Sequence, residues 1–244
     1  MKLEREWATF LPPARFAYRY RSRILGWFLE GHVFLREALY RAWPKAIRRD
    51  LAVNERIVEV PFVLRSLNLP SGSRVLDVGS QWSLLPLHLA ALGYRTVATD
   101  LAPLSIRGAG AEDVVADLRA APFRTESFDG ATMMSTLEHI GIGFYDDRRG
   151  EADDAVVMQE LWRIVRPGGL LVLTVPYGRG GSGPLQRAYD HGRLRAVTDK
   201  WTWETDRYFA RFGVEWKEVP EQEAAATESA LETHAVAALC LRRP

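Results

Sequence analysis

The chain has 244 residues, of which 47% are hydrophobic and 26% are charged, and its net charge is +1. This composition is typical of one α/β domain with additions, and the balanced charge gives no argument for nucleic acid or an anionic membrane as a partner. A single cysteine excludes an intrachain disulfide, no apolar run is long enough to span a membrane, and no apolar signal core follows the acidic first residues, so we expect a cytoplasmic protein.

The first 70 residues are rich in arginine and aromatic side chains. Apolar residues recur there at helical spacing, for example Ile24, Trp27 and Phe28, which predicts two or three helices. Pro44 is expected to end one of them. We expect residues 1–70 to form a helical extension that caps the main domain. The alternative is a lid or an oligomer interface near an active site, such as that of a homodimer.

From about residue 73, short β-rich runs alternate with helical ones. The predicted strands are 74–78, 96–99, 114–115, 128–134, 170–175, 213–219 and 235–241. The predicted helices are 84–92, which Gly93 ends, and 152–165, which a Pro-Gly-Gly turn follows. This alternation predicts an α/β fold with a doubly wound, mostly parallel, seven-stranded sheet over residues 71–244.

Acidic residues and a glycine follow the first two strands, at the edge where open α/β sheets bind ligands. Gly79 lets a ligand approach the backbone. Asp100 comes 23 residues after Asp77, about where nucleotide folds place an acid for ribose hydroxyls. Gln81 and Leu84 break the glycine pattern of dinucleotide-binding turns. An acid at this turn also suits a cationic ligand better than a pyrophosphate.

Four segments, in order over residues 73–176, resemble the motifs of class I methyltransferases that use S-adenosylmethionine (SAM). Val75-Leu76-Asp77-Val78-Gly79 looks like the first motif, and Asp100-Leu101 looks like the acidic end of the second strand. Residues 116–123 are similar to the adenine-site segment, in which Asp117 would accept a hydrogen bond from the adenine amino group. Residues 161–169 are similar to the helix and turn before strand five.

The resemblance implies a Rossmann-like fold that binds SAM and closes with an antiparallel hairpin. The cofactor-binding residues that it implies are Asp77, Gly79, Ser80, Gln81, Asp100, Leu101, Asp117, Leu118 and Ser135. The chain departs from the family where Gln81 and Ser83 replace further glycines, so we expect a different loop around the methionine moiety. We predict that Gln81 contacts the cofactor; the alternative is a surface loop residue.

The segment Ser135-Thr136-Leu137-Glu138-His139 follows the fourth strand, which in the resembled family faces both SAM and the acceptor. With an ordinary pKa of about 6.5, a histidine can take a hydroxyl proton during methyl transfer. We therefore predict His139 as the general base, with Glu138 as its orienting partner or a metal ligand. The alternative for His139 is a structural histidine bonded to the backbone.

Some members of the resembled family carry Glu-x-x-Glu-His and bind a divalent cation. Ser135 stands in place of the first acid, so that metal site is incomplete and a divalent metal is not indicated. Four other residues are candidates for a different metal site: Asp146, Asp147, Asp190 and His191.

These residues predict a SAM-dependent O-methyltransferase that acts on a hydroxyl of a sugar, a glycan or a similar small molecule. The order Asp-Val-Gly-Ser-Gln, with Tyr189-Asp190 and Arg193-Leu194 downstream, also resembles methyltransferases found with polysaccharide-building enzymes. A phenol or quinone acceptor is the alternative within this class. An RNA methyltransferase and a non-catalytic SAM-fold protein are two further alternatives, and the near-zero net charge argues against the first.

Overall fold

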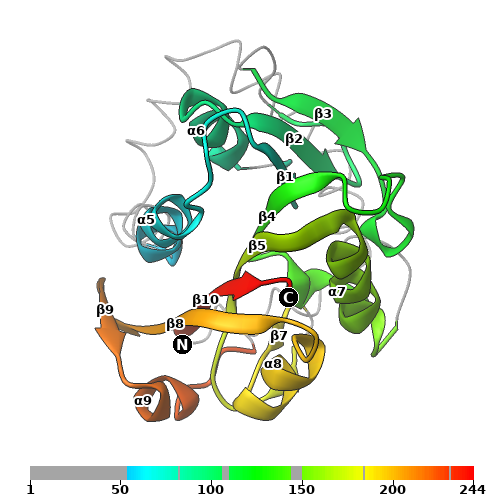
Figure 1. The fold of residues 1–244 in the computed structure, drawn as a ribbon. Coiled ribbons are helices and arrows are strands. Elements are labelled where there is room, and N and C mark those ends of the chain that lie inside the picture. Colours follow the sequence, from blue (N-terminus) through cyan, green and yellow to red (C-terminus); the bar gives the residue numbers. More distant parts are fainter. Residues whose placement is uncertain (1–53, 82, 106–109, 144–149, 184, 231) are drawn as a thin grey trace, which may run out of the picture.

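The computed structural model describes residues 54–244 apart from 82, 106–109, 144–149, 184 and 231 (Figure 1). Helices predicted before residue 54 therefore lie outside the described residues. The main sheet contains β1 (Arg74–Val78), β2 (Arg95–Asp100), β3 (Glu112–Val115), β4 (Phe128–Met134), β5 (Val165–Pro176), β8 (Thr202–Phe212), β9 (Glu215–Val219) and β10 (Ala235–Arg242). The helices are α5 (Arg56–Ser66), α6 (Leu85–Ala91), α7 (Asp153–Ile164), α8 (His191–Val197) and α9 (Glu221–Ala225).

Four further short elements complete the described part of the chain. The strands β6 (Gly181–Ser182) and β7 (Arg187–Ala188) form a separate two-stranded ribbon. Two 3-10 turns, Leu118–Ala120 and Leu137–His139, follow β3 and β4. Within the described ranges, none of the helices combines the length and apolar character needed to cross a bilayer.

The eight strands of the main sheet run in the order β3-β2-β1-β4-β5-β10-β8-β9. The first five are parallel to their neighbours, whereas β10 is antiparallel to both β5 and β8, and β9 is antiparallel to β8. The strand order reverses between β1 and β4. In doubly wound sheets such a reversal opens a crevice at the carboxyl ends of the two strands, and ligands bind there.

The predicted doubly wound fold is confirmed, with one strand more than expected. The predicted bounds of β1 and β4 match the structure. The strand β8 was not predicted, because its first residues are polar and only its last part is buried. The last two predicted strands are β9 and β10, but they do not form a hairpin with each other, since β8 lies between them.

Helices cover both faces of the sheet (Figure 1). On one face, Val63 of α5 and Leu89 of α6 share an apolar cluster with Val172 of β5. On the other face, Leu161 of α7 packs in a larger cluster that contains Leu173. Adjacent residues of β5 thus serve opposite layers, as the pleat of a strand requires. The helix α5, which lies within the predicted extension 1–70, packs on the sheet; the division of the chain at residue 70 stays a prediction.

A buried ionic cluster ties α7 to the segment after β5. Asp154 is 1% exposed; its Oδ2 forms an ion pair with Arg187 (3.0 Å) and accepts hydrogen bonds from Arg193 (2.9 Å) and the Tyr189 hydroxyl (3.0 Å). The side chain of Arg187 is almost as deeply buried. Two cations converge on one carboxylate, so removing the carboxylate leaves a buried charge without compensation.

The substitution Asp154→Ala is therefore expected to lower the free energy of unfolding by about 3–5 kcal/mol. Urea denaturation measures this directly. The matched control is Glu160→Ala, which removes a partly exposed ion pair with Arg163 on the same helix and should cost about 0.5 kcal/mol. Equal losses for the two variants would contradict the role assigned to Asp154.

Candidate active site

The turn after β1 touches the turn after β4. Gly79 has a φ of +77°, which glycine adopts without strain. Its backbone N–H donates to the carbonyl of Thr99 (2.9 Å), and a Cβ added at this position would collide with the side chain of Thr136. Only glycine therefore fits where the two turns meet, at the point where the strand order reverses.

Two acids stand at the ends of β1 and β2, as the sequence predicts. Asp77 is 2% exposed; its Oδ1 accepts from the Thr132 hydroxyl (2.6 Å), and burial raises the pKa of its carboxyl to about 7. Asp100 accepts from the backbone N–H of Gln81 (3.2 Å), and burial raises the pKa of Asp100 as well. The backbone N–H of Gln81 therefore helps to orient Asp100, the residue that is predicted to bind the ribose hydroxyls.

In the adenine-site segment, Asp117 is paired with a neighbouring arginine. The guanidinium of Arg119 binds both carboxylate oxygens of Asp117, at 2.9 Å and 2.8 Å, and also pairs with Asp153 (2.9 Å). Oδ1 of Asp117 also accepts from the backbone N–H of Arg119 (2.9 Å), so Arg119 engages both oxygens of this carboxylate, and the predicted contact of Asp117 with the adenine amino group stays a prediction. Leu101 is exposed and Leu118 is buried, and their contact with an adenine ring stays a prediction.

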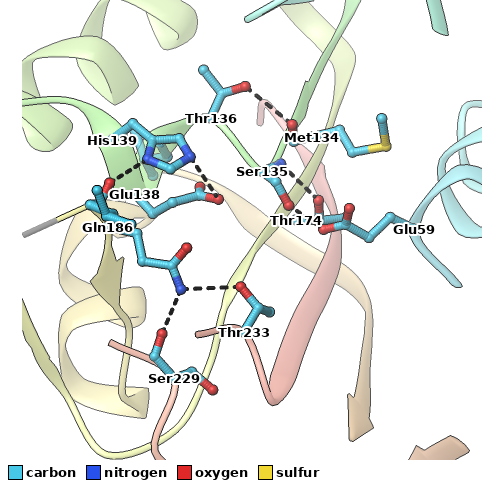
Figure 2. A network of polar contacts seen from close by, with 12 residues as sticks. Glu59, Met134, Ser135, Thr136, Glu138, His139, Thr174, Gln186, Ser229 and Thr233 are labelled. Atoms are coloured by element: carbon cyan, nitrogen blue, oxygen red, sulfur yellow. Dashed lines mark hydrogen bonds and ion pairs between the residues drawn. The ribbon is translucent and has the colours of Figure 1, made fainter. Parts of the chain in front are cut away.

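The turn after β4 is held by a buried polar network (Figure 2). Ser135 has a φ of +43°, which is uncommon for a residue with a side chain. Its N–H donates to Oγ1 of Thr174 (3.1 Å), and its hydroxyl donates to Oε1 of Glu59 (2.5 Å). Glu59 also pairs with Arg56 (2.8 Å). In the structure, the hydroxyl of Ser135 thus serves a protein contact, while its predicted contact with the cofactor remains untested.

Sequence reasoning did not identify Glu59 and Arg56 as residues of this site. They lie on α5, which precedes the sheet, and Glu59 contacts a residue 76 positions later in the chain. The available signal was an Arg and a Glu three residues apart in a largely apolar helix. A carboxylate in that pattern is easily assigned to the solvent-facing side, yet Glu59 is fully buried.

Glu138 and His139 lie next to each other in the 3-10 turn. Glu138 is 1% exposed, and its Oε1 lies 3.8 Å from Nε2 of His139. Burial raises the pKa of Glu138 well above its usual range, and the nearby Glu59 raises it further. These effects favour the neutral carboxylic acid beside the imidazole.

The imidazole of His139 is oriented by the backbone. Its Nδ1 lies 2.8 Å from the carbonyl oxygen of Leu185. A carbonyl only accepts hydrogen bonds, so Nδ1 carries the proton and Nε2 carries the lone pair. Burial lowers the pKa of His139 to about 4, against the opposing effect of the Leu185 bond. The ring is therefore neutral at pH 7, with Nε2 as its basic atom.

The metal candidates do not form a site among the residues that the structure describes. No group of three or more His, Cys, Asp or Glu side chains there has an arrangement that could hold a metal ion. Asp190 caps α8 by accepting from the N–H of Arg193 (2.8 Å), and His191 pairs with Glu221 (2.6 Å). Asp146 and Asp147 lie outside the described residues.

Three buried polar atoms at the ends of β1 and β4 have no hydrogen-bond partner among the described residues: Oδ2 of Asp77, Oγ of Ser80 and Oε2 of Glu138. Burying such atoms without a partner is costly. Two of them are acceptors on acids with raised pKa values, which suits a ligand that brings positive charge and hydrogen-bond donors. SAM carries a sulfonium, an ammonium and ribose hydroxyls, so the residues present fit it.

Comparison with known proteins assigns the same region to methyltransferases. Residues 76–173 match a family described as "Methyltransferase domain". The chain is 32% identical over 117 residues to the ubiquinone biosynthesis O-methyltransferase of Xanthomonas axonopodis pv. citri, covering 43% of this chain and 44% of that protein. It is 30% identical over 111 residues to the demethylmenaquinone methyltransferase of Mycobacterium sp. (strain KMS), covering 44% of each. The chain thus spans less than half the length of these relatives.

A solved structure shows the same fold over most of the chain. It is a 1,6-didemethyltoxoflavin-N1-methyltransferase from Burkholderia thailandensis, with bound 1,6-didemethyltoxoflavin and S-adenosylhomocysteine. The TM-score is 0.56, and the match covers 95% of this chain and 90% of that chain at 16% identity. At this identity the likeness concerns the fold alone.

The substitution Gly79→Ala is expected to abolish the binding of S-adenosylhomocysteine, because the added methyl group pushes the two turns apart. Isothermal titration measures the loss. Gly72→Ala is the matched control: Gly72 has a similar φ of +83°, but no atom lies within 4 Å of the added Cβ, so that variant suffers backbone strain alone. If both variants bound like the unchanged protein, the turn after β1 would not be the cofactor site.

Proposed function

The chain carries a class I SAM-dependent methyltransferase domain, and from that premise we propose that it methylates a hydroxyl group of a small molecule, with His139 as the general base. One observation carries the proposal. The Leu185 carbonyl fixes Nδ1 of His139 as the protonated nitrogen, which makes Nε2 the atom that accepts a proton. This imidazole lies in the turn that meets Gly79 through Thr136.

The chain's own residues would supply positioning and proton transfer. Bound SAM supplies an already activated methyl group. Asp77 and Asp100 would complement its positive charge and its ribose hydroxyls, and Gly79 admits it close to the backbone. On transfer of that methyl group to an acceptor hydroxyl, Nε2 of His139 would take up the proton that the oxygen loses. The imidazole would then carry the positive charge that the cofactor had brought, and the demethylated cofactor would leave as a neutral thioether.

The pKa of His139 bears on the class of acceptor. A base with a pKa of about 4 is weak, so it works best on a hydroxyl that is itself acidic. A phenol, with a pKa of about 10 as in tyrosine, is far more acidic than the alcohol groups of a sugar. The name of one relative, a ubiquinone biosynthesis O-methyltransferase, points the same way. A phenolic or quinol hydroxyl is therefore the first acceptor to test, and a sugar hydroxyl is the second.

The proposal is tested by incubating the protein with methyl-labelled SAM and separate pools of quinols, phenols and sugars. Label should appear in an acceptor as a methyl ether. His139→Gln should lower kcat by about 10²–10⁴-fold without changing the affinity for S-adenosylhomocysteine. His88→Gln, an exposed histidine on α6, is the matched control. Full turnover by the His139 variant would remove the general-base role, and label on nitrogen or carbon alone would remove O-methylation.

A further inference from the structure

The buried acid of α5 requires a physical explanation. Glu59 is fully buried, and α5 otherwise buries the apolar residue Val63 against the sheet. The partner of Glu59, Arg56, keeps 40% of its side chain exposed, and pairing a buried carboxylate with a cation gives little net stability compared with apolar residues of similar size. The Glu59–Arg56 pair is therefore poorly explained by folding stability alone, and its contacts show what else it does.

Both residues of this pair form hydrogen bonds with residues at the end of β4 (Figure 2 shows Glu59). Glu59 accepts the short hydrogen bond from the Ser135 hydroxyl at 2.5 Å, while Nη1 of Arg56 donates to the carbonyl of Met134 at 3.3 Å. From the other side, Thr174 accepts from the N–H of Ser135 through both its hydroxyl and its carbonyl, each at 3.1 Å. Residues 134 and 135 are thus held between α5 and β5.

The residue held in this way, Ser135, has an unusual backbone conformation. Ser135 has a φ of +43°, a conformation that persists in a residue with a side chain only when its surroundings enforce it. The chain leaves β4 at this point and enters the 3-10 turn, in which the N–H of His139 donates to the carbonyl of Thr136 (3.1 Å). A change of φ at Ser135 would therefore alter the orientation of the whole turn, including Glu138 and His139.

We infer that Glu59 and Arg56 are positioning residues, which act through Ser135 to set the placement of His139 at the active site. The inference rests on the proposed function for its kinetic consequences, but the placement of the imidazole can be measured without any acceptor. Neither residue needs to touch the substrate for this role. The helix before the sheet thereby becomes part of the catalytic apparatus.

The kinetic test uses Glu59→Ala, Glu59→Gln, Ser135→Ala and the double variant Glu59→Ala/Ser135→Ala. Glu59→Ala should lower kcat by about 100-fold, the size of effect produced by a 1 Å misplacement of a reacting group, with little change in the KM for SAM. Glu59→Gln, whose amide oxygen still accepts from Ser135, should recover most of the activity. The double variant should be no worse than Glu59→Ala, because both changes break the same contact. Arg65→Ala, on the exposed side of α5, is the control.

The second readout is the pH titration of the His139 imidazole by NMR, assigned by its loss in His139→Gln. The ionisable groups near it are Arg56 and Glu138, and Glu59 pairs with Arg56. Removing the negative charge of Glu59 alone would lower the pKa of His139 further. If the turn is released into solvent, the pKa instead rises from about 4 toward its ordinary value. An upward shift of the His139 pKa therefore indicates that the turn has lost its position, whereas a downward shift indicates only the lost charge of Glu59.

An upward shift of the His139 pKa in Glu59→Ala, absent in Arg65→Ala, supports the inference even if no acceptor is found. An unchanged or lowered pKa overturns it, and so do additive losses in the double variant. If Glu59→Ala does not fold, Ser135→Ala carries the same test, because it breaks the hydrogen bond and leaves the Glu59–Arg56 pair intact. An upward shift without any methyl transfer would count against the proposed function alone.

Discussion

The contact between the turn after β1 and the turn after β4 is the constraint on which the rest of the site depends. Gly79 and Thr136 approach so closely that no side chain fits between them, and this contact lies where the strand order reverses. The buried acid of β1 and the Glu138–His139 turn after β4 therefore stand at the same edge of the sheet. Because β1 and β4 are parallel neighbours, their following turns lie at the same edge of the sheet. Glu59 of α5 accepts a hydrogen bond from Ser135 and so holds the turn after β4 in its unusual conformation.

Burial without full hydrogen bonding gives the site its chemical character. Asp77 and Glu138 each keep one oxygen without a partner among the described residues, and burial raises the pKa of both. Burial also lowers the pKa of His139, so its imidazole is neutral. A site of this kind disfavours isolated charges when empty. It gains most from a ligand that brings its own positive charge and hydrogen-bond donors.

Strand bounds and the acids near strand ends could be predicted from the sequence, whereas side-chain contacts between distant segments could not. The strands β1 and β4 are almost uniformly buried, so their apolar runs gave the correct bounds, and the acids that follow β1 and β2 could be placed from strand order. The strand β8 was missed because only one part of it is buried. The Glu59–Ser135 contact and the double pairing of Arg119 with Asp117 and Asp153 were also missed, since local patterns carry no information about which distant side chains meet.

The most direct test of the cofactor site is the proton balance of SAM binding, measured by titration calorimetry just below pH 7 in two buffers of different ionisation enthalpy. The pKa of Asp77 in the protein without ligand is about 7, so a cation bound beside it should drive a proton off. The heat should depend on the buffer in the unchanged protein, and it should depend on the buffer more weakly in Asp77→Asn, because Asp100 and Glu138 also have raised pKa values. No binding at millimolar SAM, or the same proton release in both proteins, would contradict the assignment of the cofactor site.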